Sequence, residues 1–102
     1  MHYVAVEWLH LTPNEPTRLY YELDSERYER RKVEEYRDGT FHSASAAHGQ
    51  GTPFLAWEPH PPLAEIEADP QFRAREINAQ EFERVWARAI EGALQPATSL
   101  AR

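Results

Sequence analysis

Residues 78–94 read Asn-Ala-Gln-Glu-Phe-Glu-Arg-Val-Trp-Ala-Arg-Ala-Ile-Glu-Gly-Ala-Leu, and this stretch carries the clearest structural signal in the chain. Its apolar side chains recur every three or four residues, as they do along one face of an α-helix. Asn78 is a good N-cap, and Glu81 three residues later completes the pattern of a capping box. The apolar stripe consists of Phe82, Val85, Trp86, Ala89, Ile90 and Ala93. Such a stripe predicts a second layer against which the helix packs.

Stretches that alternate apolar and polar residues, or are rich in aromatic and β-branched residues, supply that layer. We predict strands at residues 3–11 and 17–23, separated by a loop that contains two prolines. A third strand at residues 27–37 is highly charged, and its register requires a bulge if Tyr28, Val33 and Tyr36 are all to pack. Asp38-Gly39 favours a tight turn into a fourth strand at residues 40–46.

The region between the fourth strand and the helix is less regular. Residues 54–57 fit either a short strand or an apolar plug at the edge of the core, and prolines follow. Residues 63–69 form a candidate helix of about two turns, ended by Asp69-Pro70, and residues 72–77 a last strand. The prediction is therefore an α+β fold: an antiparallel sheet of four to five strands, a short helix, and a long C-terminal amphipathic helix packed on one face. We expect one domain at residues 1–94 and a frayed tail at residues 95–102.

Composition and charge narrow the classes of function. The 102 residues include no cysteine, which excludes disulfides and thiolate sites and favours a cytoplasmic location. No signal peptide or membrane span is expected, because apolar runs are short. The formal net charge is −6, and two acidic segments, residues 1–26 and 53–70, each contribute a net −4 by residue count. This charge argues against nucleic-acid binding and favours a basic partner or simple solubility.

Several motifs in fixed order resemble a family of small bacterial proteins known as a domain of unknown function. The motifs lie between residues 3 and 90: Trp8-Leu9-His10, Asn14-Glu15-Pro16, Leu19-Tyr20-Tyr21-Glu22-Leu23-Asp24, Arg27-Tyr28-Glu29-Arg30-Arg31-Lys32-Val33-Glu34, Asp38-Gly39, Pro62-Leu63-Ala64-Glu65-Ile66, Asp69-Pro70 and Glu81-Phe82-Glu83-Arg84-Val85-Trp86. The resemblance implies no activity and no catalytic residues. Its association with short, separate bacterial genes is compatible with an immunity or accessory role.

The residues that are candidates for binding or catalysis are scattered along the chain. Paired strands would bring Glu22 against Arg31, either as a ligand-binding cluster or as a solvated ladder of ion pairs. The five histidines lack the spacing of a zinc site, so no metal and no cofactor are expected. His10, His42 and His48 are candidates for general acid–base chemistry, and residues 49–52 fit a plain loop better than a phosphate loop.

The favoured hypothesis is a non-catalytic binding module that recognises a basic protein partner, with Trp57 and Glu58 supplying aromatic surface and negative charge. Trp57 fits equally well as a plug of the core. The alternative is a small enzyme or small-molecule binder, whose cleft would be lined by His10, Tyr21, Glu22, Arg31 and His42. A further alternative is a homo-oligomeric domain that pairs through an exposed strand edge.

Overall fold

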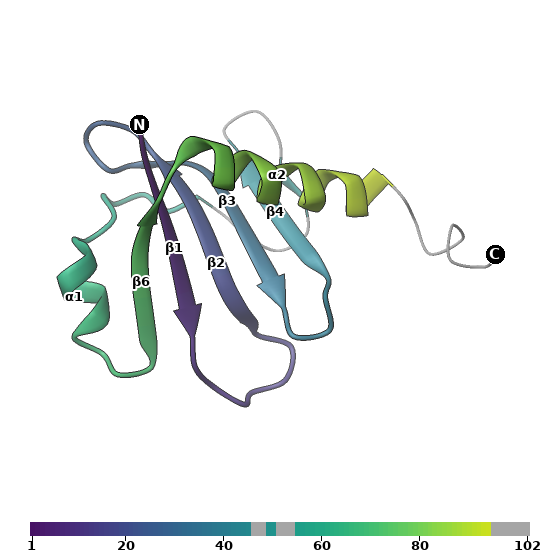
Figure 1. Ribbon diagram of the computed structural model, residues 1–102, viewed down its shortest axis with the longest axis horizontal. Helices are drawn as coiled ribbons and strands as arrows, with labels where there is room; N and C mark the ends of the chain where they lie inside the picture. The colour runs from purple at the N-terminus through teal and green to yellow at the C-terminus, as the bar shows by residue number, and fades with distance from the viewer. Residues whose placement is uncertain (46–48, 51–54, 95–102) are drawn as a thin grey trace.

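The computed structural model describes residues 1–45, 49–50 and 55–94 of the chain (Figure 1). In chain order the elements are β1 (His2–Trp8), β2 (Pro16–Leu23), β3 (Glu29–Tyr36), β4 (Phe41–Ser45), β5 (Gly49–Gln50), α1 (Leu63–Glu67), β6 (Phe72–Ile77) and α2 (Ala79–Leu94). The predicted α+β class is confirmed, with an antiparallel sheet, a short helix and a C-terminal helix. The tail predicted at residues 95–102, and the histidine at position 48, lie outside the described residues.

The sheet has the strand order β5-β4-β3-β2-β1-β6, and each pair of neighbours is antiparallel. The first five strands form a meander, whereas β6 returns from the far side of the molecule to pair with β1. That return aligns Tyr3 with Ile77 and Trp8 with Phe72. Among the described residues the sheet holds five strands of five or more residues and the two-residue β5.

Two strands differ from their predicted bounds for local reasons. β1 ends at Trp8 and not at residue 11, because the imidazole of His10 turns back to hydrogen-bond the carbonyl of Pro16 at 2.7 Å. β3 begins at Glu29, because the carboxylate of Asp24 accepts hydrogen bonds from the backbone N–H groups of Glu26 and Tyr28. The Asx-type turn leaves Tyr28 outside the strand.

The expected bulge is present near the start of β3. Glu22 pairs with Arg31 but Leu23 pairs with Glu29, so Arg30 is the extra residue. Asp38-Gly39 makes the predicted turn, in which Gly39 takes a φ of 90° that only glycine adopts easily.

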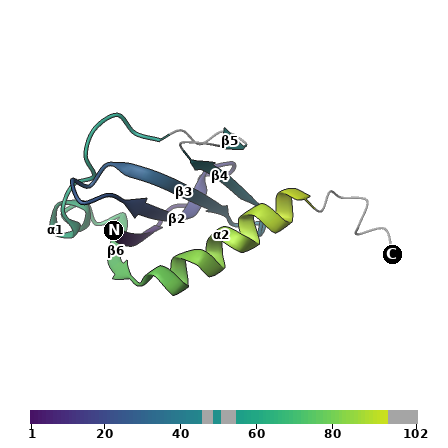
Figure 2. The ribbon, with the colours of Figure 1, turned by 90° about the horizontal axis from the view of Figure 1, so that it is seen from above.

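One face of the sheet, here called the helix face, packs against α2 (Figure 2). Its buried residues are Ala5, Tyr20, Val33 and Ile77, which meet Phe82, Val85 and Ala89 of the helix. The Asn78 side chain caps α2 by accepting a hydrogen bond from the Glu81 backbone N–H at 2.8 Å. The Glu81 carboxylate does not complete a capping box, because it pairs with Arg75 at 2.7 Å. The charged guanidinium of Arg75 is a stronger hydrogen-bond donor than the neutral backbone N–H of Asn78, to which Glu81 would bond in a capping box.

The opposite face, here called the groove face, carries a second core of Val4, Val6, Leu19, Tyr21 and Leu23. Leu63 and Ile66 of α1 pack against it from one side. Residues 55–62, which lead into α1, run on this side of the sheet, away from α2 (Figure 2). No helix in the described ranges is long and apolar enough to cross a bilayer.

Candidate functional site

An apolar groove of about 400 Å³ lies on the groove face, between the sheet and the segment that contains α1. Its floor comes from β1 and β2, because alternation along each strand places every second side chain on this face. β6 and α1 close one side. The residues that line the groove are Val6, Trp8, Leu19, Tyr21, His60, Pro61, Glu65, Ile66, Asp69 and Phe72. The volume falls in the range that holds a side chain or a small ligand.

Aromatic rings form much of the groove wall. The rings of Trp8 and Phe72 lie 5.7 Å apart and are tilted by 30°, since the register of β1 and β6 pairs these two residues directly. The ring of Tyr21 lies 4.3 Å from that of His60. Burial, reinforced by the nearby carboxylates of Glu29 and Glu34, raises the pKa of the Tyr21 hydroxyl, which therefore stays neutral at physiological pH.

A network of hydrogen bonds holds residues 55–62 against the sheet. The Arg27 guanidinium donates to the backbone carbonyls of His60 and Pro61, at 2.9 and 2.8 Å. The backbone N–H of His60 donates to the carbonyl of Arg27 at 2.7 Å. The buried Glu29 carboxylate accepts from the N–H of Ala56 at 2.9 Å. These contacts place His60 at the inner end of the groove.

The His60 side chain is neutral in this position. Burial, together with the positive charges of Arg27 and Lys32, lowers the pKa of its imidazole to about 4. Its Nε2 lies 4.0 Å from the Glu29 carboxylate. Its Nδ1 is buried and has no hydrogen-bond partner in the part of the chain that the structure describes.

Carboxylates line the outer rim of the groove. Glu65 and Asp69 line the groove itself and are exposed to solvent. Glu58 and Glu67 lie exposed nearby in the sequence. Residues 53–70 include four acids and no lysine or arginine. The groove therefore combines an apolar interior with a negatively charged rim.

A family model described as a domain of unknown function, DUF6881, matches residues 2–91. The chain belongs to the DUF6881 family. The match confirms the expected resemblance to a domain of unknown function. No curated protein and no solved structure matches the chain.

The five residues of the predicted cleft do not lie together in this DUF6881 domain. Glu22 and Arg31 lie on the helix face, where Arg31 donates to Glu22 at 2.7 and 2.9 Å and also pairs with Glu83 of α2. Tyr21 points to the other face and lines the groove. One continuous cleft is therefore not formed, because neighbouring residues on a strand point to opposite faces.

Two histidines predicted as site residues, His10 and His42, make local contacts within the fold. His10 uses both ring nitrogens within the β1–β2 loop: Nε2 contacts the Pro16 carbonyl at 2.7 Å, and Nδ1 accepts from the Thr12 N–H at 3.0 Å. His42 lies on β4 with its ring 4.9 Å from that of Tyr36. Neither lines the groove. Among the described residues no cluster of three or more histidine and carboxylate side chains is arranged to hold a metal ion.

Trp57 and Glu58 are exposed on the segment that precedes the groove. The Trp57 side chain is 95% exposed, so it does not plug the core. Three residues later the same segment supplies His60 to the groove.

Sequence reasoning missed His60 and Phe72 as groove residues. The sequence shows a histidine among prolines and a phenylalanine after Asp69-Pro70, but no local pattern joins them. The acidic rim of the groove, in contrast, is indicated by the sequence, because residues 53–70 carry only negative charges.

Proposed function

We propose that this domain is a non-catalytic binding module that recognises a basic segment of a partner protein in the groove. The observation that carries the proposal is the acid-rimmed apolar groove, in which Trp8, Tyr21 and Phe72 lie beneath the exposed carboxylates of Glu65 and Asp69. An immunity or accessory role in a bacterial cytoplasm is compatible with such a module and with the absence of cysteine.

Lysine and arginine side chains match both properties of the groove. Each combines an apolar stem with a charged head, so the stem can cover apolar surface while the head stays near solvent. Here the stem would contact Trp8 or Phe72, and the head would meet Glu65 or Asp69. Aromatic faces add attraction for a cation. A purely apolar or acidic segment would leave the rim carboxylates without a counter-charge.

The exposed Trp57 belongs to the same segment as the groove residues His60 and Pro61. Tryptophan is among the residues that contribute most to binding when a partner covers them, and Glu58 beside it repeats the pairing of ring and carboxylate. Both belong to the segment that Arg27 and Glu29 fix against the sheet. We propose that a partner that extends beyond the groove uses Trp57 as a second anchor.

Two other functions have weaker support. A small molecule could occupy the groove, but the five-residue cleft on which the enzyme hypothesis rested is divided between two faces. Homo-oligomerisation through a strand edge has β6 as one of the two edge strands available to it. There the backbone N–H of Ala74 already donates to the carboxylate of Glu67 at 3.2 Å, a contact that reduces the edge's capacity to pair with another strand.

The test is selection of random peptides on the full chain, followed by measurement of the affinity of the selected peptides at low and high salt. We expect enriched peptides to combine lysine or arginine with apolar residues. Their dissociation constants should rise at least about tenfold in the Glu65→Lys plus Asp69→Lys variant and at high salt, because exposed charges are screened.

The matched control is Glu26→Lys plus Glu91→Lys, which changes the net charge by the same amount at exposed positions outside the groove. Equal weakening by both double variants would assign the binding to overall charge. Enrichment of peptides without lysine or arginine would overturn the proposal.

A further inference from the structure

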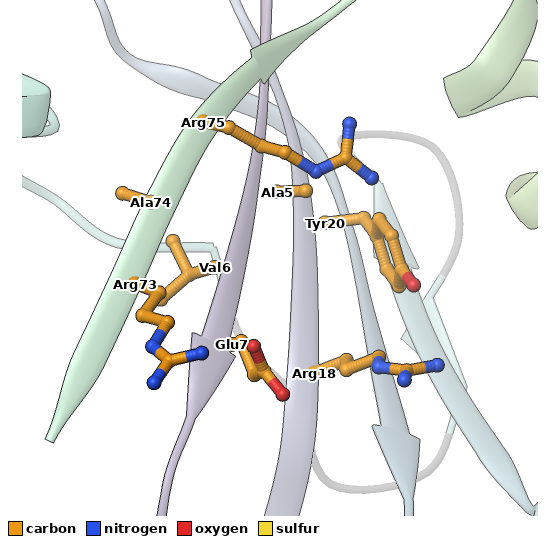
Figure 3. A pocket seen from close by; sticks show the side chains of 8 residues that line it. All are labelled: Ala5, Val6, Glu7, Arg18, Tyr20, Arg73, Ala74 and Arg75. Carbon is orange, nitrogen blue, oxygen red and sulfur yellow. The ribbon is translucent and has the colours of Figure 1, made fainter.

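A second cavity, of about 480 Å³, lies on the helix face where α2 does not reach, and three arginines surround it (Figure 3). α2 crosses the sheet near one end of the strands and leaves the opposite end of β1, β2 and β6 uncovered on that side (Figure 1). We call this cavity the arginine hollow; it is lined by Ala5, Val6, Glu7, Arg18, Tyr20, Arg73, Ala74 and Arg75.

The strand register explains why the arginines converge. Glu7 pairs with Arg18 on one side and with Arg73 on the other, so these three side chains form one row across β6, β1 and β2. The next row places Arg75 beside Ala5 and Ala5 beside Tyr20. Ala5 is the smallest side chain in the two rows, and the Arg75 side chain extends past it toward the Tyr20 ring (Figure 3).

The three guanidinium groups differ in how far they are already engaged. Arg75 is held by Glu81 at 2.7 Å. Arg18 approaches Glu35 only at 3.9 Å and is 57% exposed. Within the described part of the chain, the side chains of Arg73 and Glu7 make no hydrogen bond and no ion pair. Arg73 and Arg18 therefore keep free donors at the mouth of the hollow.

The lining residues carry three positive charges and one negative charge, in a chain whose net charge is −6. The carboxylates of Glu81 and Glu35 offset Arg75 and Arg18 from outside the lining, so among the described residues Arg73 is the lining arginine without an ion pair. The planar fork of an arginine is suited to bidentate contact with phosphate and carboxylate oxygens. Tyr20 adds an aromatic wall, and its hydroxyl donates to Glu35 at 3.3 Å.

We propose that the arginine hollow binds a small ligand through an oxyanion group, a phosphate or a carboxylate, held between Arg18 and Arg73 with Arg75 at the inner rim. This site is separate from the groove: the two lie on opposite faces of the sheet. In this arrangement Glu7 lies beside the anion and opposes it by charge repulsion. Removing the Glu7 charge should therefore tighten oxyanion binding.

The test is NMR titration of the ¹⁵N-labelled full chain with inorganic phosphate, pyrophosphate and succinate, at constant ionic strength set with chloride. We expect saturable shifts of the Arg18 and Arg73 Nε–H signals and of the Glu7 amide, with the amide of Ile66 in the groove unchanged. Arg73→Gln should weaken binding about tenfold, since one charge-assisted pair is lost, and Glu7→Gln should strengthen it.

The control is Arg84→Gln, which removes the same charge from an exposed position on α2 outside the hollow. Arg73 is exposed, so its replacement should leave the fold intact, and the spectrum of each variant without ligand verifies this. Tighter binding of pyrophosphate than of succinate would identify a phosphate-bearing ligand, and the reverse order a carboxylate.

Shifts that do not saturate would overturn the proposal, as would equal weakening by Arg73→Gln and Arg84→Gln. Weaker binding in Glu7→Gln would also overturn it. The titration tests binding of anions at the arginine hollow, whereas the peptide selection tests binding of cationic peptides in the groove. A negative result in one experiment therefore does not affect the conclusion from the other.

Discussion

Arg31 is a single side chain that joins three elements of the molecule. Its guanidinium donates to Glu22 on β2 and to Glu83 on α2, and it lies 4.9 Å from the Phe82 ring and 5.0 Å from the Trp86 ring. Hydrogen bonds from Arg31 lower the pKa of the Glu22 carboxyl despite its burial. That contribution to stability is present above the ordinary carboxyl pKa and is lost as the pH falls through the lowered value.

Replacing Arg31 with glutamine should therefore lower the free energy of unfolding by about 3 kcal/mol, because the buried Glu22 loses its counter-charge. The matched variant is Arg75→Gln, which breaks an exposed pair with Glu81 and should cost about 1 kcal/mol or less. Urea unfolding followed by circular dichroism measures both. Equal losses in the two variants would show that the Glu22 pair is no more important than a surface ion pair.

At the scale of elements, sequence patterns located most strands and the main helix because those patterns are local. Alternation in residues 17–23 and the three-to-four-residue spacing in residues 82–93 each reflect one element burying one face. The pairing of β6 with β1 was not predictable, since Trp8 and Phe72 meet only through the path of the intervening chain. The role of Glu81 was misassigned, because its partner Arg75 lies on the preceding strand.

Residues 55–62 form neither a helix nor a strand, and polar contacts hold this segment in place. Arg27, Glu29 and the His60 backbone fix this segment to the turn between β2 and β3. The imidazole of His60 in this segment packs on Tyr21. This arrangement was not predictable from local sequence patterns, because Arg27 adopts its unusual φ of 70° only in the folded turn.

The buried imidazole of His60 should make stability depend on pH. Its pKa is lowered to about 4 in the folded protein, against an ordinary value near 6.5. Between these values the unfolded chain binds a proton that the folded protein does not bind, so stability is complete above about pH 6.5 and falls toward pH 4. The slope for one proton is at most about 1.4 kcal/mol per pH unit.

The measurement is the free energy of unfolding at several pH values between 7 and about 4.5, where the carboxyl groups still contribute little. A His60→Phe variant retains an aromatic ring against Tyr21 and should show a flatter profile in this range. His2→Phe, at a partly exposed position, is the control and should keep the slope of the natural protein. Identical slopes in all three proteins would place the pH dependence elsewhere.

At the scale of the whole molecule, one sheet separates the acid-rimmed groove from the hollow that is lined by three arginines. The acidic rim of the groove could be anticipated from residues 53–70, because its acids all belong to this one segment, which has no lysine or arginine. The arginine hollow could not, because Arg18 and Arg73 are brought together only by the sheet register. The predicted cleft failed for the related reason that Tyr21 and Glu22, as neighbours on a strand, face opposite sides.

The same sheet also joins the two cores into one cooperative unit. Val4 and Ala5 are adjacent on β1 but belong to different cores, as do Tyr20 and Tyr21 on β2. Neither core can therefore lose its packing while the other keeps intact strands. We expect the chain to unfold in a single transition, as small domains with one shared framework usually do.

The three tryptophans allow this expectation to be checked, because Trp8 lies at the groove-face core, Trp86 at the helix-face core, and Trp57 in solvent. Variants that keep only one tryptophan, with phenylalanine at the other two positions, should show a urea midpoint by fluorescence equal to the midpoint by circular dichroism in the same variant. The variant that keeps only Trp57 is the control and should show little change in fluorescence. If Trp86 fluorescence changes at lower urea than circular dichroism, α2 separates from the sheet before the sheet unfolds, and the two cores are not one unit.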